Sequence, residues 1–536
     1  MKIGIDFDNT IVKYDEIFVK AAKEKNFVSS TWLCNKETLK QKLNGKKNQW
    51  EKIQGIVYGP SMRNAICFPG LKKFLIKTNF SGHQVFIISH KTIYGHFDKT
   101  KTRLRDQALL WLEQEDFFNS EFISLKKENI FFCDDRERKI KKINELNLDF
   151  MIDDLDEIFE NNTLPKTKNI LFSATATITN ASYICKNWDQ VSSLILTEKN
   201  NKKSLIKLCN KLYNRKSIKS IVKLKKGGNS RVYKMTDYEN NFYILKEYPN
   251  HQLRTKPRLM NEVSALKLLY HTDKVPEVIY YDHDINISVL EFINGTPVKK
   301  VTNQNIYDAL NFVQEMFNLS KTNKFKSTLA TEACLNANEL IGQIENRFNK
   351  LQLIKNDKLQ YTLKKLYDLY LQLLERAYKT WPKNNINKSL NKNFMTFSPS
   401  DFGFHNSILN KSKELKFIDF EYFGLDDPVK LIADFLWHPG MTLDEKQKIL
   451  FTKNVLKIFN KDEYLRERLN ASFSLYGIRW ALIILNDFLS EKMFLCIQPN
   501  LYKNERSEIH LNVQLDKSMK IYNNIIYNNM ECNYAT

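Results

Sequence analysis

Residues 397–406 read FSPSDFGFHN and lie in a part of the chain whose pattern is otherwise mostly helical. Asp401 and Asn406 are five residues apart, a spacing that suits a catalytic base and a Mg²⁺ ligand carried on one loop. The short predicted strand 416–420 follows and carries Asp419, a carboxylate that can bind the same metal. The stretch therefore predicts an acidic site for Mg²⁺ between helical segments.

A strand-rich region, 217–293, lies upstream of this stretch. Its residues 225–230 read KKGGNS, and such glycines let the backbone approach phosphates closely, although a simple two-glycine hairpin is the alternative. A strand lysine paired with a helix glutamate positions the phosphates of ATP in kinases, and Lys246 and Glu262 have that placement. The stretch 289–295 reads as an edge strand that leads into a hinge, where backbone groups can bind adenine. The predicted ATP-binding residues are therefore Gly227, Gly228, Asn229, Ser230, Lys246, Glu262, Glu291 and Ile293.

These motifs together resemble the aminoglycoside phosphotransferase and choline kinase-like superfamily. Its pattern is H-G-D-x-x-x-x-N, then I-D-[FW]-E, then D-P and a further Asp, and residues 418–421 read IDFE here. One departure is Pro399, which stands where the family has a histidine two residues before the base. Residues 401–403 spell the D-F-G of protein kinases, but no H-x-D motif lies just upstream. We therefore interpret Asp401 as the base and Asp419 as the metal ligand.

The resemblance implies an α+β bilobal, protein-kinase-like domain. It implies a β-rich N-lobe at 205–298 and a helical C-lobe at 299–536, with the catalytic loop at 397–434. It also implies ATP and Mg²⁺ as cofactors, with Asn406 and Asp419 on the metal, and a hydroxyl of a sugar or amino alcohol as phosphoacceptor. His405 is expected to pack the loop rather than take part in catalysis.

The N-terminus carries a second acidic pattern, because residues 1–10 read MKIGIDFDNT. Asp6 and Asp8 follow an apolar strand, where they could act as nucleophile and general acid, although a Ca²⁺ loop or a solvated turn is the alternative. Candidate partners follow in order: Ser89 ends a buried strand, Lys139 lies in a predicted helix, and Asp153 and Asp154 end another strand. A hydroxyl and a lysine suit a phosphate group, whereas paired carboxylates suit Mg²⁺.

This ordered set resembles the haloacid dehalogenase (HAD) superfamily of phosphatases. The resemblance implies a Rossmann-like parallel α/β sheet over 1–195, a small helical insert at about 12–69, and a linker at 196–204. It implies Asp6 as nucleophile, Asp8 as acid/base, and Asp6, Asp8, Asp153 and Asp154 as candidates for the metal. Ser89 and Lys139 would contact phosphate, although for Lys139 a solvated helix face is the competing interpretation.

Composition limits the remaining possibilities. The 536 residues allow two to four domains, and 43% hydrophobic residues exclude collagen-like and wholly disordered chains. The eight cysteines form no C-x-x-C pair, no run approaches a membrane span, and Asp6 interrupts the start of the chain, so we expect a cytoplasmic protein. The net charge of +21 comes from interspersed residues, which favours solvation over a polyanion partner.

The two resemblances together predict a bifunctional enzyme, a Mg²⁺-dependent phosphatase fused to an ATP-dependent kinase. Their substrates would be a phosphomonoester and a small-molecule phosphoacceptor, and the hypothesis for the pathway is the synthesis of activated sugars for surface polysaccharide. Nucleic-acid end processing is an alternative that the charge favours, but the chain has no G-x-x-x-x-G-K-[ST] loop. A pseudokinase binding module is a third hypothesis, which rests on Pro399. The sequence predicts no oligomeric state.

Overall fold

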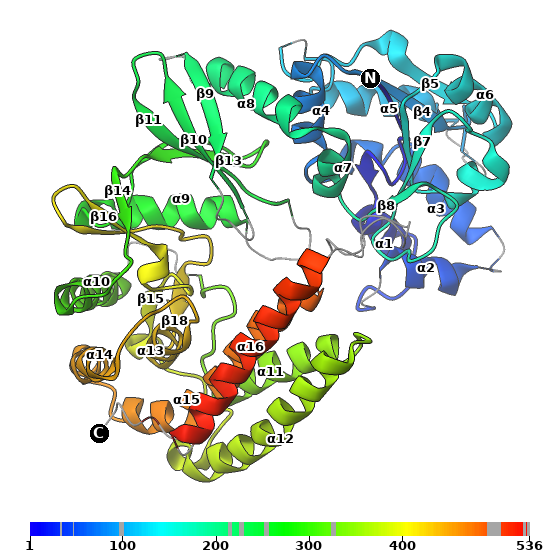
Figure 1. The fold of residues 1–536 in the computed structure, drawn as a ribbon. Helices are drawn as coiled ribbons and strands as arrows, with labels where there is room; N and C mark the ends of the chain where they lie inside the picture. The colour runs from blue at the N-terminus through cyan, green and yellow to red at the C-terminus, as the bar shows by residue number, and fades with distance from the viewer. Residues whose placement is uncertain are drawn as a thin grey trace.

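The protein is described by a computed structural model, in which two α/β regions and a helical region follow one another along the chain (Figure 1). The residues that the structure describes are 1–32, 35–44, 46, 48–95, 101–119, 121–212, 217–224, 230–250, 257–322, 328–489, 505–528 and 532.

The N-terminal region is built on a six-stranded sheet of order β5-β4-β1-β6-β7-β8, in which all neighbouring strands run parallel. Its strands are β1 (Lys2–Ile5), β4 (Gln84–His90), β5 (Ile130–Cys133), β6 (Phe150–Asp153), β7 (Lys168–Phe172) and β8 (Tyr183–Cys185). The predicted parallel sheet is confirmed, and β8 is a strand that the sequence analysis did not predict. Because β1 lies between β4 and β6, the ends of these three strands lie side by side.

Helices connect the strands of this sheet. They are α4 (Leu71–Phe80), α5 (Leu104–Gln114) and α6 (Arg136–Leu146), and a further helix, α7 (Trp188–Ile195), follows the last strand, β8. Between β1 and α4 the chain forms three helices, α1 (Asp15–Glu24), α2 (Lys36–Leu43) and α3 (Gln49–Tyr58), and a small ribbon of β2 (Val12–Lys13) and β3 (Ile66–Cys67). Stacking of Phe18 on Trp50, with ring centroids 4.9 Å apart, holds α1 against α3.

A helix lies where the sequence predicted the linker 196–204. Helix α8 (Glu198–Leu212) buries Leu205, Leu208 and Cys209 and covers the junction of α4 with the next sheet (Figure 1). The polar run at its start suggested a linker, but the apolar residues that follow recur three and four positions apart, which is the spacing of one helix face. The sequence analysis missed this helix because the predicted linker ended at residue 204, just before the apolar residues begin.

The second sheet is antiparallel, with the order β12-β13-β11-β10-β9. Its strands are β9 (Ile218–Lys223), β10 (Arg231–Asp237), β11 (Phe242–Glu247), β12 (Val278–Asp282) and β13 (Ile287–Glu291), and α9 (Arg258–Leu269) is its helix. We call this sheet and its helix the N-lobe. Alternate residues of a strand point to opposite faces, so Lys246 and Glu247 on β11 face different sides of the sheet.

The rest of the chain is mainly helical, and we call it the C-lobe. Its helices are α10 (Asn303–Lys321), α11 (Ala337–Leu351), α12 (Asp357–Thr380), α13 (Pro428–Trp437), α14 (Glu445–Ile458), α15 (Leu465–Ile484) and α16 (Glu505–Tyr527). Short strands accompany them: β14 (Gly295–Pro297), β15 (Thr396–Ser398), β16 (Ser407–Asn410), β17 (Leu415–Phe417) and β18 (Gly424–Asp426). Strands β15 and β16 flank the loop 399–406.

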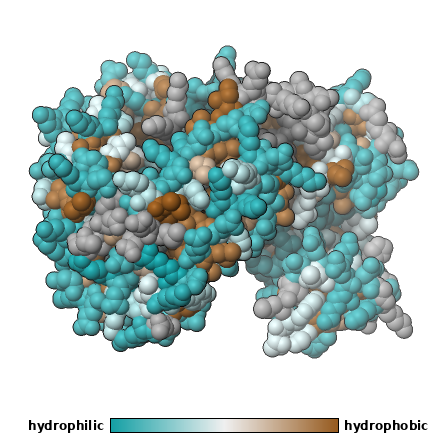
Figure 2. All heavy atoms as spheres, turned by 60° about the horizontal axis from the view of Figure 1, so that its bottom comes forward, coloured by the Kyte–Doolittle hydropathy of each residue, from teal (hydrophilic) through white to brown (hydrophobic). Residues whose placement is uncertain are grey.

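The surface is mainly hydrophilic on the face that Figure 2 shows. Hydrophobic residues form separate patches there. Within the described part of the chain, none of the helices has the length and apolar character that crossing a membrane would require.

Candidate active sites

The first site lies at the carboxyl ends of β1, β4 and β6. Lys139, which extends from α6, places its Nζ 2.5 Å from Asp6 Oδ1 and 2.6 Å from Asp153 Oδ2. Its side chain is only 1% exposed, which is inconsistent with the alternative of a solvated helix face. The structure thus brings Asp6, Lys139 and Asp153 together, and Ser89 is buried at the end of the neighbouring strand β4.

Asp8 lies beside this group and has two partners of its own. The Tyr14 hydroxyl donates to Asp8 Oδ1 at 2.6 Å, and Lys91 Nζ donates to both carboxylate oxygens at 2.9 and 3.0 Å. The sequence analysis named neither Tyr14 nor Lys91. Lys91 follows the predicted strand-end Ser89 by two residues, so its position in the sequence was the available signal.

The carboxylates of this site repel one another in a buried setting. Burial is the main cause that raises the pKa of Asp6 to about 7, with Asp153 and Asp8 adding to it and Lys139 opposing it. Burial, followed by the charge of Asp6, also holds the pKa of Asp154 well above its usual value. Oxygen atoms of Asp6, Asp153 and Asp154 lie within 4.8 Å of one another. Since Mg²⁺ prefers oxygen ligands and would offset this repulsion, the three residues fit the ion.

A cavity of about 700 Å³ opens onto this site. Its lining includes Asp6 and Asp8, which follow β1, Lys139 from α6, and Lys36 and Tyr58 from α2 and α3. Residues of the three-helix segment therefore form part of the cavity wall. The volume is sufficient for a small phosphorylated molecule.

The second site lies between the two lobes, where Lys246 of β11 contacts three carboxylates. Its Nζ lies 2.8 Å from Glu262 of α9, 2.7 Å from Asp419 and 2.9 Å from Glu421. Burial alone would lower the pKa of Lys246, but Asp419, Glu262 and Glu421 raise it well above its usual value. The predicted strand–helix pair therefore forms, and it joins the N-lobe to the C-lobe residue Asp419.

Glu421 belongs to this cluster, although the sequence analysis assigned it no role. Arg258 of α9 also contacts Glu421, with 3.1 Å between Nη1 and Oε2. Carboxylate oxygens of Glu262, Asp419 and Glu421 lie within 4.8 Å of one another, which is a donor set of the kind Mg²⁺ binds. Glu421 is the final residue of the IDFE pattern, so its place in that motif could have identified it as a site residue.

The remaining predicted ATP-binding residues divide into two groups. Gly227, Gly228 and Asn229 lie outside the described residues. Ser230 is buried immediately before β10, and Ile293 is buried after β13. Glu291 is exposed at the end of β13, where its carboxylate accepts a hydrogen bond from the Glu277 backbone at 3.1 Å.

The loop at 399–406 carries the predicted base Asp401 and the predicted metal ligand Asn406. Asn406 Nδ2 donates to the Asp401 backbone carbonyl at 3.0 Å and to Asp401 Oδ2 at 3.2 Å. The Ile418 backbone donates to Asn406 O at 3.0 Å, so the loop is joined directly to the segment that carries Asp419. Asp419 itself has a φ of 72°, and non-glycine residues in this strained region cluster at functional sites.

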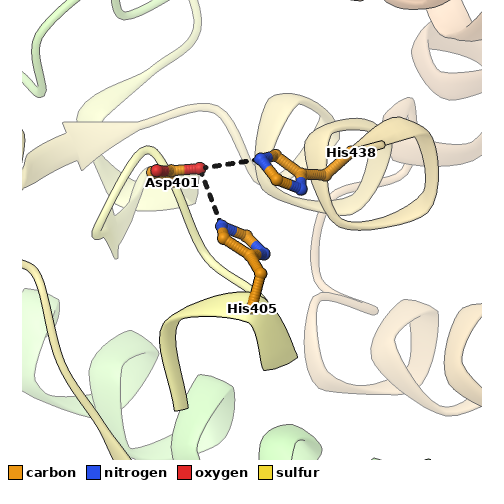
Figure 3. Close-up of side chains that lie close together, drawn as sticks. All are labelled: Asp401, His405 and His438. Carbon is orange, nitrogen blue, oxygen red and sulfur yellow. Dashed lines mark hydrogen bonds and ion pairs between the residues drawn. The ribbon is translucent and has the colours of Figure 1, made fainter. Parts of the chain in front are cut away.

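Two histidines meet the Asp401 carboxylate, as Figure 3 shows. His405 Nε2 lies 3.0 Å and His438 Nε2 lies 3.4 Å from Asp401 Oδ1, and the two rings stack with centroids 3.6 Å apart. Burial would raise the pKa of Asp401, but its hydrogen bonds and the histidines lower it to about 2. Burial, and then His405, lower the pKa of His438 to about 4.

The sequence analysis expected His405 to pack the loop rather than take part in catalysis. The structure adds that its ring nitrogen contacts the proposed base, which the sequence analysis did not predict. His438 was missed altogether: it follows α13, and nothing in the sequence connects it to residue 401. The three side chains could alternatively hold a metal ion, since their donor atoms lie within 4.8 Å of one another.

Comparison with known proteins places a family on part of the chain. Residues 220–452 match the phosphotransferase enzyme family. The chain therefore carries a phosphotransferase-family domain that includes Lys246, Asp401 and Asp419. No curated protein matches the chain.

Several solved structures are similar to this chain at low identity. A choline kinase from Streptococcus pneumoniae is 14% identical, with 58% of this chain and 98% of that chain covered and a TM-score of 0.37. An ethanolamine kinase from Plasmodium vivax is 15% identical, covering 60% and 89% with a TM-score of 0.39. An aminoglycoside phosphotransferase in complex with AMP-PNP and hygromycin B is 11% identical, covering 59% and 97% with a TM-score of 0.40.

Proposed function

We propose that residues 205–536 form an ATP-dependent kinase that phosphorylates a hydroxyl group of a small molecule. The single observation that carries this proposal is the contact of Lys246 with both Glu262 and Asp419, within the segment that matches the phosphotransferase family. A lysine held in this way is placed to contact the phosphates of ATP, while Asp401 lies on the loop beside it. We extend the proposed acceptor class to sugars and amino alcohols.

In the proposed reaction, Asp401 accepts the proton of the acceptor hydroxyl. The hydroxyl oxygen then forms a bond to the γ-phosphorus of ATP while the bond to the β-phosphate bridging oxygen breaks, so that ADP leaves. Lys246 would bind the phosphates, with Glu262 fixing its position. Asn406 and Asp419 would hold Mg²⁺, which supplies positive charge for the transferred phosphoryl group.

We further propose that residues 1–195 form a phosphatase of the HAD type. Asp6 would attack the phosphorus of a phosphomonoester and displace its alcohol, whose oxygen takes a proton from Asp8. Water, deprotonated by Asp8, would then release the phosphate from Asp6. Ser89 and Lys139 would bind the phosphate oxygens, and Asp6, Asp153 and Asp154 would hold Mg²⁺, which offsets the charge of the phosphate.

Opposed reactions on one phosphate group would only consume ATP. We therefore propose that the two sites act on different positions of one metabolite, or on two successive intermediates. The supporting feature is that each site has its own lysine among its own acidic residues, in a different region of the chain.

The test uses the full chain and the variants Asp6→Asn and Asp401→Asn, with exposed Asp284→Asn as the matched control. ATP-dependent phosphorylation is assayed with choline, ethanolamine, aminoglycosides and sugars, and phosphate release with a panel of phosphomonoesters. Asp401→Asn should lose only phosphorylation and Asp6→Asn only phosphate release. Loss of both activities in either variant would contradict two independent sites, and phosphorylation of peptides alone would contradict the acceptor class.

A further inference from the structure

The contacts of Asp401 differ from those that the phosphotransferase resemblance implies. That resemblance places a histidine two residues before the base, but the residue there is Pro399, which has no side-chain donor. Asp401 instead receives its ring contacts from His405, four residues later, and from His438 at the end of α13 (Figure 3). The support of the proposed base therefore comes from a different side of the loop.

We propose that His405 and His438 are positioning residues that orient the Asp401 carboxylate through their Nε2–H groups, in place of the missing histidine. This inference rests on the proposed kinase function. Both rings approach Oδ1, so Oδ2 stays available to accept the proton of the substrate hydroxyl, with Asn406 Nδ2 3.2 Å away. His405 makes the shorter contact and is the main donor of the pair.

The hydrogen-bond network assigns the proton of His438. The Gly440 backbone N–H donates to His438 Nδ1 at 3.0 Å, so Nδ1 carries a lone pair and the proton of the neutral ring is on Nε2. That proton faces Asp401 Oδ1 at 3.4 Å, a long contact of the kind that shortens when substrate binds. A metal ion on Nε2 would require the opposite tautomer, in which Nδ1–H would oppose Gly440 N–H. The network therefore favours hydrogen bonding over metal binding.

The surrounding backbone is shaped to admit the two rings. A Cβ atom on Gly403 would lie 2.8 Å from both His405 Nδ1 and Met441 Sδ, and one on Gly440 would lie 3.0 Å from His405 Cβ and His438 Cε1. Glycines at both positions thus provide the space in which the imidazoles stack. Trp480 packs edge-on against His438, with centroids 4.6 Å apart, and fixes the outer ring.

Matched substitutions separate a donor role from a packing role. His405→Phe and His438→Phe keep a flat ring but remove the donor, whereas His405→Gln and His438→Gln keep an amide N–H near the position of Nε2. Since a hydrogen bond to a charged group is strong, we expect the Phe variants to lower kcat roughly 10- to 100-fold, more for His405, with KM for ATP unchanged. The Gln variants should recover most of the loss, and His283→Phe, at a side chain 70% exposed, is the control.

The outcomes distinguish this inference from the proposed function. If Asp401→Asn phosphorylates the acceptor as well as the unaltered protein does, the proposed function fails. If Asp401→Asn is inactive but both Phe variants keep full kcat, or if Gln and Phe variants lose activity equally, the positioning role is overturned while the function stands. Thermal unfolding of each variant shows whether a loss of kcat reflects unfolding.

A second measurement does not depend on finding the acceptor. Nitrogen-15 NMR of the full chain, labelled at histidine and assigned with His438→Gln, reports which ring nitrogen carries the proton. We expect the His438 proton on Nε2, and a change of its resonance in Asp401→Asn. A proton on Nδ1, or a resonance that is insensitive to Asp401, would overturn the proposal even without any kinase assay.

Discussion

Lys77 of α4 and Glu247 of β11 form a buried ion pair, with 2.5 Å between Nζ and Oε1, across the contact of the N-terminal region with the N-lobe. Both side chains are nearly inaccessible, and Asn201 and Tyr233 complete their hydrogen bonds. Glu247 is the neighbour of Lys246 on the same strand, so one peptide unit connects this contact to the proposed ATP site. The pair therefore contributes to holding the lysine-bearing strand in place.

The charge of Glu247 should make stability depend on pH. Burial alone would raise the pKa of Glu247, but Lys77, Lys73 and Arg231 lower it to about 2, compared with 4.5 for an ordinary glutamate. Between these values the unfolded chain binds more protons, so the contribution of Glu247 is complete above pH 4.5 and is lost as the pH falls toward 2. At pH 7, Glu247→Gln should lower the free energy of unfolding by about 3–5 kcal/mol, because Lys77 is left unpaired.

Urea unfolding at a series of pH values checks this prediction. The difference between the unaltered protein and Glu247→Gln should shrink as the solution is acidified. Glu24→Gln, at a side chain 61% exposed, should show almost no difference at any pH. A difference that stays constant down to pH 3 would mean that Glu247 is not charged in the folded protein.

Lys430 should be critical for the stability of the C-lobe. It is fully buried on α13 and lies 3.1 Å from Asp426 Oδ2 and 3.0 Å from Asp434 Oδ2. Lys430→Met removes the cation that both carboxylates face, and we expect a loss of about 3–5 kcal/mol in unfolding free energy. Lys379→Met removes an exposed pair of the same i,i+4 spacing and should cost no more than about 1 kcal/mol. Equal losses in calorimetry would contradict this assignment.

Removal of divalent metal should stop both proposed reactions, because each site gathers carboxylates that need a cation when phosphate binds. EDTA should abolish phosphate release and phosphorylation, and added Mg²⁺ should restore them. Asp153→Asn should raise the Mg²⁺ concentration needed for phosphate release only, and Asp419→Asn that for phosphorylation only. Activity of either kind that persists after exhaustive chelation would exclude a metal from that site.

Gly295, in the short strand β14, should not tolerate a side chain. A Cβ atom there would collide with the Leu409 backbone carbonyl on β16, which cannot rotate away as a side chain would. Gly295→Ala should therefore lower stability by about 1–3 kcal/mol. Gly342→Ala in α11 meets open space and should raise stability by about 0.5–1 kcal/mol. Thermal unfolding of the two variants gives the comparison, and shifts of the same sign would argue against the steric explanation.

The sequence predicted those contacts that depend on the ends of strands. Asp6 and Asp153 end neighbouring parallel strands, and Lys246 and Glu262 come from a strand and helix that pack together, so local pattern was enough to bring each pair close. His438 could not be predicted, because its contact with Asp401 depends on how α13 packs. The helix α8 was missed for a related reason. Its polar start resembles a linker, and only its packing against α4 and β9 explains why this segment folds as a helix.

The contact that α8 covers has a consequence for any attempt to separate the proposed phosphatase from the proposed kinase. Leu75 of α4, Leu205 and Leu208 of α8, and Met235 and Leu245 of the N-lobe belong to one continuous apolar core. A chain cut near residue 195 would leave each fragment with part of this core open to water. Fragments made separately would therefore aggregate or require co-expression, because the two halves complete a shared core and fold as one unit.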